Sequence, residues 1–156
     1  MRTLRAWALT LLLAASPVAA AEGWRDYDNA AFGYAIELPT AFGIEQADGS
    51  RLLLRDGPRT LEVFGLDLAP LDFAQAVMLA MGSSVEEGFA VVAQRVTPQQ
   101  AHWRAVDGER QLAVALVPLC GSEVAGFELR YQQVDGVQMQ AIIARLEASL
   151  RRTAVC

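Results

Sequence analysis

The single histidine of this 156-residue chain, His102, is the side chain best suited to catalysis. An imidazole can act in a Ser-His-Asp triad, but the sequence has no Gly-x-Ser-x-Gly segment to present a serine. A zinc site needs three or four nitrogen, sulfur or carboxylate ligands, which are not available once both cysteines are used elsewhere. His102 stands beside Trp103 at the start of an expected strand, so we expect it at the surface or at a sheet edge.

The closest carboxylate pairs are Glu86-Glu87 and Asp26-x-Asp28. Two carboxylates can perform acid–base chemistry when they flank a substrate bond, but neighbours in one segment point in different directions. We therefore expect both pairs in solvated turns or at a helix end. Asp48-Gly49-Ser50 resembles a fragment of a calcium loop, lacks the later liganding positions and predicts a turn. The sequence thus predicts no catalytic residue, no metal site and no cofactor.

Aromatic residues are denser near the N-terminus than elsewhere, at Trp24, Tyr27, Phe32, Tyr34 and Phe42. One interpretation is packing in the core and at its edge. The other is a groove lined by aromatic rings, suited to an apolar ligand or a peptide. In that interpretation Trp24, Tyr27 and Phe42 form the candidate surface for a ligand or partner.

The first 21 residues have the pattern of a secretory signal peptide. Arg2 and Arg5 precede an apolar run of about 10 residues, too short for a spanning helix of roughly 20. Small residues then predict cleavage after Ala20 or Ala21, which leaves residues 22–156 as one domain without a stable membrane anchor. Without the two signal arginines, 11 basic residues remain against 18 acidic ones, a net charge of about −7. This charge disfavours nucleic acid and anionic lipid as partners. We expect a periplasmic or secreted protein.

The two cysteines, Cys120 and Cys156, enter an oxidising compartment if the chain is exported. An even number there favours a disulfide, whereas a redox-active pair usually has Cys-x-x-Cys spacing. An expected strand over 124–132 carries the chain about 30 Å away from Cys120. An expected helix from Gly136 then returns about 24 Å, so we expect a structural disulfide between the two.

Alternating apolar residues and turn signals predict seven strands, over 32–39, 51–55, 60–68, 90–96, 102–106, 109–118 and 124–132. The dipeptide Asp107-Gly108 predicts a hairpin. In the strand over 109–118 both faces are apolar, which predicts a central strand that is covered on each side.

Two helices are expected between and after these strands. The first starts with a capping box, Asp72-x-x-Gln75, and should end at Gly82. The second starts with a similar box, Asp135-x-x-Gln138, and should end with Arg151 and Arg152 at its C-terminus. The predicted fold is α+β, with an antiparallel sheet of about six to seven strands flanked by two helices.

The segment 27–39 resembles the opening of the PsbP-like proteins, which include bacterial DcrB-type lipoproteins and exported relatives. Its pattern is Tyr-x-Asn-x-x-Phe-Gly-Tyr-x-Ile-x-Leu-Pro. The middle helix followed by Gly88-Phe89 and the last helix closing on Ala148-Ser149-Leu150 are also similar. The resemblance implies an α/β/α sandwich, a role as accessory subunit, adaptor or chaperone, and no catalytic residues. DcrB-type members carry a lipid-attachment cysteine that this sequence lacks, so soluble export is implied.

Two functions are therefore open. The first is a noncatalytic binding or accessory protein of the periplasm with an unknown protein or peptide partner. The second is a small periplasmic hydrolase with an unrecognised site. An exposed apolar patch would favour the first function, whereas a deep pocket that combines His102 with carboxylates would favour the second.

Overall fold

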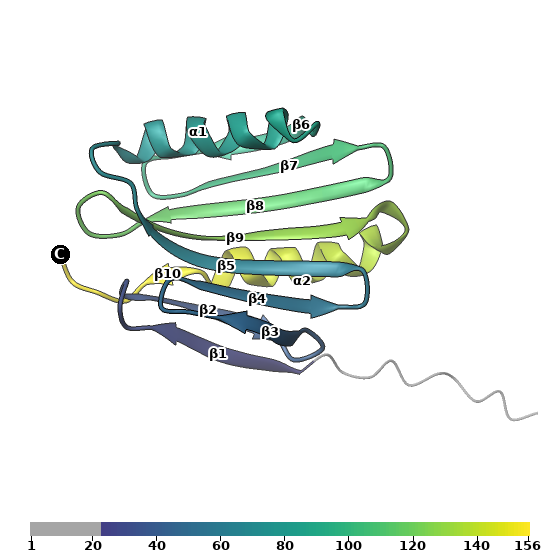
Figure 1. Ribbon diagram of the computed structural model, residues 1–156, viewed down its shortest axis with the longest axis horizontal. Helices are drawn as coiled ribbons and strands as arrows, with labels where there is room; N and C mark the ends of the chain where they lie inside the picture. Colours follow the sequence, from purple (N-terminus) through teal and green to yellow (C-terminus); the bar gives the residue numbers. More distant parts are fainter. Residues whose placement is uncertain (1–22) are drawn as a thin grey trace, which may run out of the picture.

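The computed structural model describes residues 23–156, and the predicted signal peptide with its cleavage site lies outside this range. The chain forms a seven-stranded antiparallel sheet in the order β3-β4-β5-β9-β8-β7-β6 (Figure 1). Its strands are β3 (Gly43–Ala47), β4 (Arg51–Asp56), β5 (Arg59–Asp67), β6 (Ala90–Val96), β7 (Ala101–Asp107), β8 (Arg110–Pro118) and β9 (Glu123–Gln132). A smaller sheet has the order β1-β2-β10 and consists of β1 (Trp24–Asn29), β2 (Tyr34–Pro39) and β10 (Arg151–Arg152).

Two helices lie on opposite faces of the large sheet, α1 (Phe73–Glu86) and α2 (Gly136–Ser149), the second preceded by a 3-10 turn at Gln133–Asp135. The α+β class and the two flanking helices agree with the sequence prediction. Six of the seven predicted strands belong to the large sheet. The seventh, predicted over 32–39, pairs instead with β1 and β10, and β1, β3 and β10 were not predicted.

The central strand β8 separates two apolar cores, as its apolar faces predict. Leu112, Val114 and Leu116 face α1, in a core that includes Val77 and Trp103. Ala113 and Ala115 face α2, in a larger core built with Met139, Ile142, Ile143 and Leu146 and with strands β2, β4, β5 and β9. The hairpin before β8 lies one residue later than predicted, because Asp107 pairs with Arg110 and Gly108 takes a positive φ of 58°.

The helix ends differ from three predictions. Asp72 and Gln75 form the predicted capping box, but α1 runs past Gly82 to Glu86, and Gly88, with a φ of 96°, ends the segment. A single glycine inside a helix costs only about 1 kcal/mol, which the packing of the flanking turns offsets. Asp135 caps nothing, since it belongs to the 3-10 turn that leads into α2. Arg151 and Arg152 do not stabilise a helix end, because they leave α2 and pair with β2.

Among residues 23–156, none of the helices is long and apolar enough to cross a membrane.

Candidate functional site

Helix α1 has an unusual surface for a helix that covers a sheet. Only one of its 14 residues, Glu86, is charged. Met78, Leu79 and Val85 point away from the sheet with exposed fractions of 74%, 58% and 57%. An outer helix face normally carries polar and charged residues, so large apolar side chains there are typical of a surface that contacts another molecule.

The inner side of α1 is held firmly in place. Val77 packs into the core beneath the helix. The indole Nε1 of Trp103 donates a hydrogen bond of 3.2 Å to the Ser84 hydroxyl oxygen. With Asp72 capping the first turn, these contacts fix the helix against β7 and thereby fix which residues face outward.

Edge strand β6 extends the apolar surface of α1. Val92 and Val96 are 60% and 48% exposed on this strand, which contains one charged residue, Arg95. Near the start of α1, a cavity of about 430 Å³ is lined mainly by Phe73, Ala74, Val96 and Pro98. We call Met78, Leu79, Val85, Val92 and Val96 the α1–β6 surface.

On its other side α1 borders a groove of about 340 Å³ over β5 and β9. The floor is apolar and consists of Phe64, Leu66, Val114, Leu116 and Val124. Gly126 allows this close packing, since a Cβ there would lie 2.5 Å from Leu116 Cδ2.

Charged residues form one end of this groove. Glu62 and Glu128 lie directly opposite each other on β5 and β9. Arg51 pairs with Glu62 at 2.9 Å, and Arg130 pairs with Glu128 and, at 2.8 Å, with Glu87 of the turn after α1. Burial raises the pKa of the Glu128 carboxyl, while the neighbouring Arg130 guanidinium acts to lower it.

The aromatic residues predicted as a partner surface mostly serve the core. Phe42 is fully buried, so its assignment to an exposed surface was wrong. The reason is a turn in which the Phe42 N–H bonds to the carbonyl of Pro39 and folds the ring back under the sheet. Trp24 and Tyr27 are half-buried against the same core, and the Arg145 guanidinium lies 4.5 Å from the centroid of the Trp24 ring.

The other residues considered for chemistry are dispersed. Asp48 accepts hydrogen bonds from the backbone N–H groups of Ser50 and Arg51, the turn that was predicted. These bonds lower the pKa of its carboxyl. His102 meets one carboxylate, Glu147, on the face of the sheet opposite the groove. Within residues 23–156 no group of three or more His, Cys, Asp or Glu side chains is placed to hold a metal ion.

Cys120 and Cys156 lie at disulfide distance, with their Cα atoms 5.4 Å apart, in agreement with the predicted pairing. Cys120 lies in the loop between β8 and β9, and Cys156 lies in the tail after β10. The pair therefore connects the end of the chain to the large sheet.

The sequence contained a signal for the α1–β6 surface in the composition of the first helix. A 14-residue helix with a single charge cannot have a polar outer face. The groove had no comparable local signal, because Glu62 and Glu128 are 66 positions apart in sequence and become neighbours only through the pairing of β5 with β9.

Comparison with known proteins shows that this chain is similar to solved structures in fold only. No family model matches the sequence, and no curated protein sequence matches it. The solution structure of cyanobacterial PsbP (CyanoP) from Synechocystis sp. PCC 6803 is similar with a TM-score of 0.59 and 14% identity, over 90% of this chain and 98% of that one. The crystal structure of the Saccharomyces cerevisiae Ran-binding protein Mog1p is similar with a TM-score of 0.63 and 6% identity, over 85% and 97%. The predicted PsbP-like fold is thus confirmed, while the DcrB-type relationship stays a prediction.

Proposed function

We propose that this chain is an exported, noncatalytic accessory protein that binds a partner protein through the α1–β6 surface. The observation that carries the proposal is the outer face of α1, where Met78, Leu79 and Val85 are exposed on a helix with one charge. Burying these side chains against a partner would recover roughly 25 cal/mol for each Å² of apolar surface removed from water.

Further features support this function. The signal-peptide pattern of residues 1–21 and the two paired cysteines favour an oxidising, extracytoplasmic location. Mog1p, which has a similar fold, is a Ran-binding protein, an example of this fold in protein recognition. The bulge between Val91 and Ala93 disrupts the free edge of β6, which favours a partner over edge-to-edge self-association.

A photo-reactive amino acid placed at Leu79 tests the proposal in cells that export the protein. We expect one adduct that contains a second protein, and no such adduct from the same probe at Val134, which is 90% exposed but remote from α1. Adding Met78→Lys should abolish the adduct, whereas Val137→Lys, at a site 88% exposed, should leave it unchanged. Equal adducts from both probe positions, no adduct, or an adduct of the chain with itself would contradict the proposal.

Export is tested separately by fractionation and N-terminal sequencing. We expect the mature chain in the periplasmic fraction, starting at Ala21 or Glu22. An intact Met1 on protein recovered from that fraction would contradict the predicted cleavage.

A small hydrolase is the second candidate function, favoured by one observation, the opposed carboxylates of Glu62 and Glu128 in the groove. A carboxyl whose pKa is raised by burial can serve as a general acid. If this function holds, Glu128→Gln should abolish hydrolysis of chromogenic glycosides or esters without affecting the adduct at Leu79. If the accessory function holds, the parent chain should hydrolyse none of these substrates faster than Glu128→Gln.

A further inference from the structure

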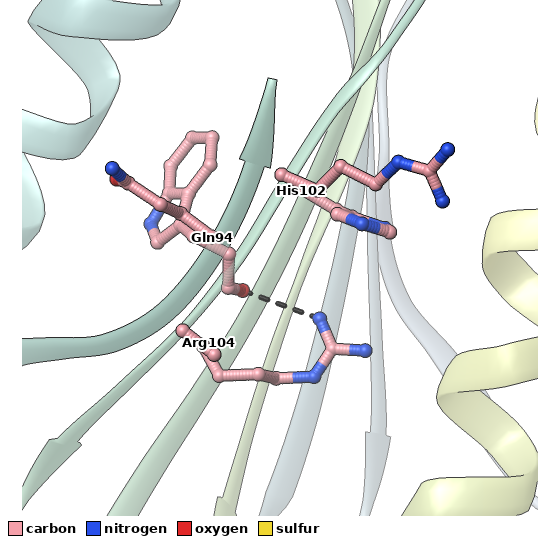
Figure 2. A pocket seen from close by; sticks show the side chains of 6 residues that line it. Gln94, His102 and Arg104 are labelled. Carbon is pink, nitrogen blue, oxygen red and sulfur yellow. Dashed lines mark hydrogen bonds between the residues drawn. The ribbon is translucent and has the colours of Figure 1, made fainter. Parts of the chain in front are cut away.

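We propose that Arg95, His102 and Arg104 form a binding site for a small oxyanion, a carboxylate or a phosphate group. The site lies on the face of the large sheet opposite α1, so it is separate from the α1–β6 surface. Figure 2 shows the imidazole of His102 and the guanidinium of Arg104 extended to the same side of the sheet, whereas Gln94 points to the other side.

Strand pairing brings the three basic side chains together. Arg95 of β6 lies directly opposite His102 of β7. Arg104 follows His102 by two residues, so alternation along the strand puts both on the same face. The cavity between them, about 220 Å³, is smaller than the 300–1,000 Å³ typical of pockets for drug-sized ligands, so it suits a small ion.

Some of the N–H donors of these basic side chains have no hydrogen-bond acceptor within the described part of the protein. One oxygen of Glu147, Oε1, accepts from Arg104 at 2.7 Å and lies 3.2 Å from Nδ1 of His102. Arg104 also donates to the backbone carbonyl of Trp103 at 3.2 Å. In the described part of the chain, the Arg95 side chain has no hydrogen-bond or ion-pair partner.

The site carries excess positive charge although the protein as a whole is acidic. The whole chain has 18 acidic and 13 basic residues, and seven of the described arginines, Arg104 included, pair with a carboxylate. At the site, two arginines face one glutamate, which leaves an excess of one positive charge. The side chains of His102 and Arg104 are only 28% and 30% exposed, so water screens this charge less than on an open surface.

An oxyanion satisfies these donors. A guanidinium group presents N–H donors in a fork that matches two oxygens of a carboxylate or phosphate. The bound anion would accept from Arg95 and from the N–H groups of Arg104 that Glu147 leaves free. Glu147 competes with the ligand for the same donors and also holds Arg104 and His102 in place while the site is empty.

The single histidine provides a direct assay. The imidazole signal of His102 is the only one of its kind in a proton NMR spectrum of the protein. We expect inorganic phosphate or succinate, titrated separately at constant ionic strength and pH, to shift it along a saturable curve. The anion that saturates at the lower concentration identifies the preferred class, and saturation by both indicates a general oxyanion site.

Three variants make the test specific. Arg95→Gln should weaken binding by about tenfold or more, because a charge-assisted donor is lost. Glu147→Gln should strengthen binding, because it removes the competing carboxylate. Arg55→Gln, on the remote strand β4 where Arg55 pairs with Glu45, is the matched control and should change nothing.

A linear shift without saturation for both anions would overturn the site, and so would a titration that Arg95→Gln leaves unchanged. Thermal melting of each variant checks that the fold is intact. Met78→Lys should not affect anion binding, which separates a failure of this site from a failure of the proposed function.

Discussion

Replacing Cys156 by serine is the most informative test of how the end of the chain is fixed. Its partner, Cys120, lies 36 positions earlier in the sequence. The segment between the two cysteines contains β9 and α2, whose side chains form a large part of the core under α2. Without the cross-link the tail keeps two backbone hydrogen bonds, from Thr153 and Ala154 to the carbonyl of Gly33. We therefore expect a destabilised protein that still folds.

The expected size follows from the length of the closed loop. A disulfide that closes a loop of 36 residues lowers the conformational entropy of the unfolded chain. In the chain-entropy model this stabilises the fold by about 4 kcal/mol. For a domain of this length, 1 kcal/mol moves the melting temperature by about 3–4 °C. Cys156→Ser should therefore melt on the order of 10–15 °C below the oxidised parent.

Calorimetry with and without reductant measures this shift. Reductant should lower the melting temperature of the parent by the same amount and have no effect on the variant in which Cys120 and Cys156 are both serine. Thiol titration of denatured protein that was isolated without reductant should find no free thiol. Two titratable thiols per chain, or equal melting temperatures for parent and double variant, would refute the disulfide.

Three further predictions concern single positions. Gly82→Ala should raise the free energy of unfolding in urea by about 0.5–1 kcal/mol, because Gly82 is helical and a Cβ there meets nothing within 4 Å; a loss of stability would contradict this account of α1. Asp48→Ala should destabilise the fold at neutral pH, because hydrogen bonds from Ser50 lower the pKa of Asp48 below 3.8 in the folded state. That contribution is full above 3.8 and disappears as the pH falls through the folded value, so an equal difference in acid and neutral melts would argue against it. Leu146→Asp should prevent folding, measured as loss of soluble, cooperatively melting protein, because it buries an unpaired charge in the α2 core.

Much of the fold could be predicted because its signals are local. Alternating side chains located six strands of the large sheet, and the two apolar faces of β8 correctly indicated its central place. The capping box at Asp72 predicted the start of α1 for the same reason, since it involves residues only three positions apart.

What could not be predicted depends on pairing at long range. β3 is entirely exposed and β10 has only two residues, so neither has an apolar pattern, and both exist because a neighbouring strand offers hydrogen bonds. The basic site has the same origin. The sequence singles out His102 as the only histidine but gives no sign of its neighbour, because Arg95 lies opposite it only through the register of β6 and β7.

The width of the large sheet explains why both proposed sites exist. Seven strands spaced about 4.8 Å apart span roughly 29 Å, whereas one helix with its side chains is about 10 Å across. A single helix therefore covers only part of either face. α1 lies over β6, β7 and β8, and it leaves the groove over β5 and β9 open.

On the other face, α2 and the small sheet cover strands β4, β5, β9 and β8. The next two strands, β7 and β6, carry His102, Arg104 and Arg95 beside the helix. The apolar and the basic surface thus lie near the same edge of the sheet, on opposite sides of β6 and β7. A partner bound at the α1–β6 surface would approach that edge without covering the oxyanion site, so the protein could hold both ligands at once. Cross-linking at Leu79 in the presence of saturating phosphate should then be undiminished, and a loss of the adduct would mean that the two surfaces compete.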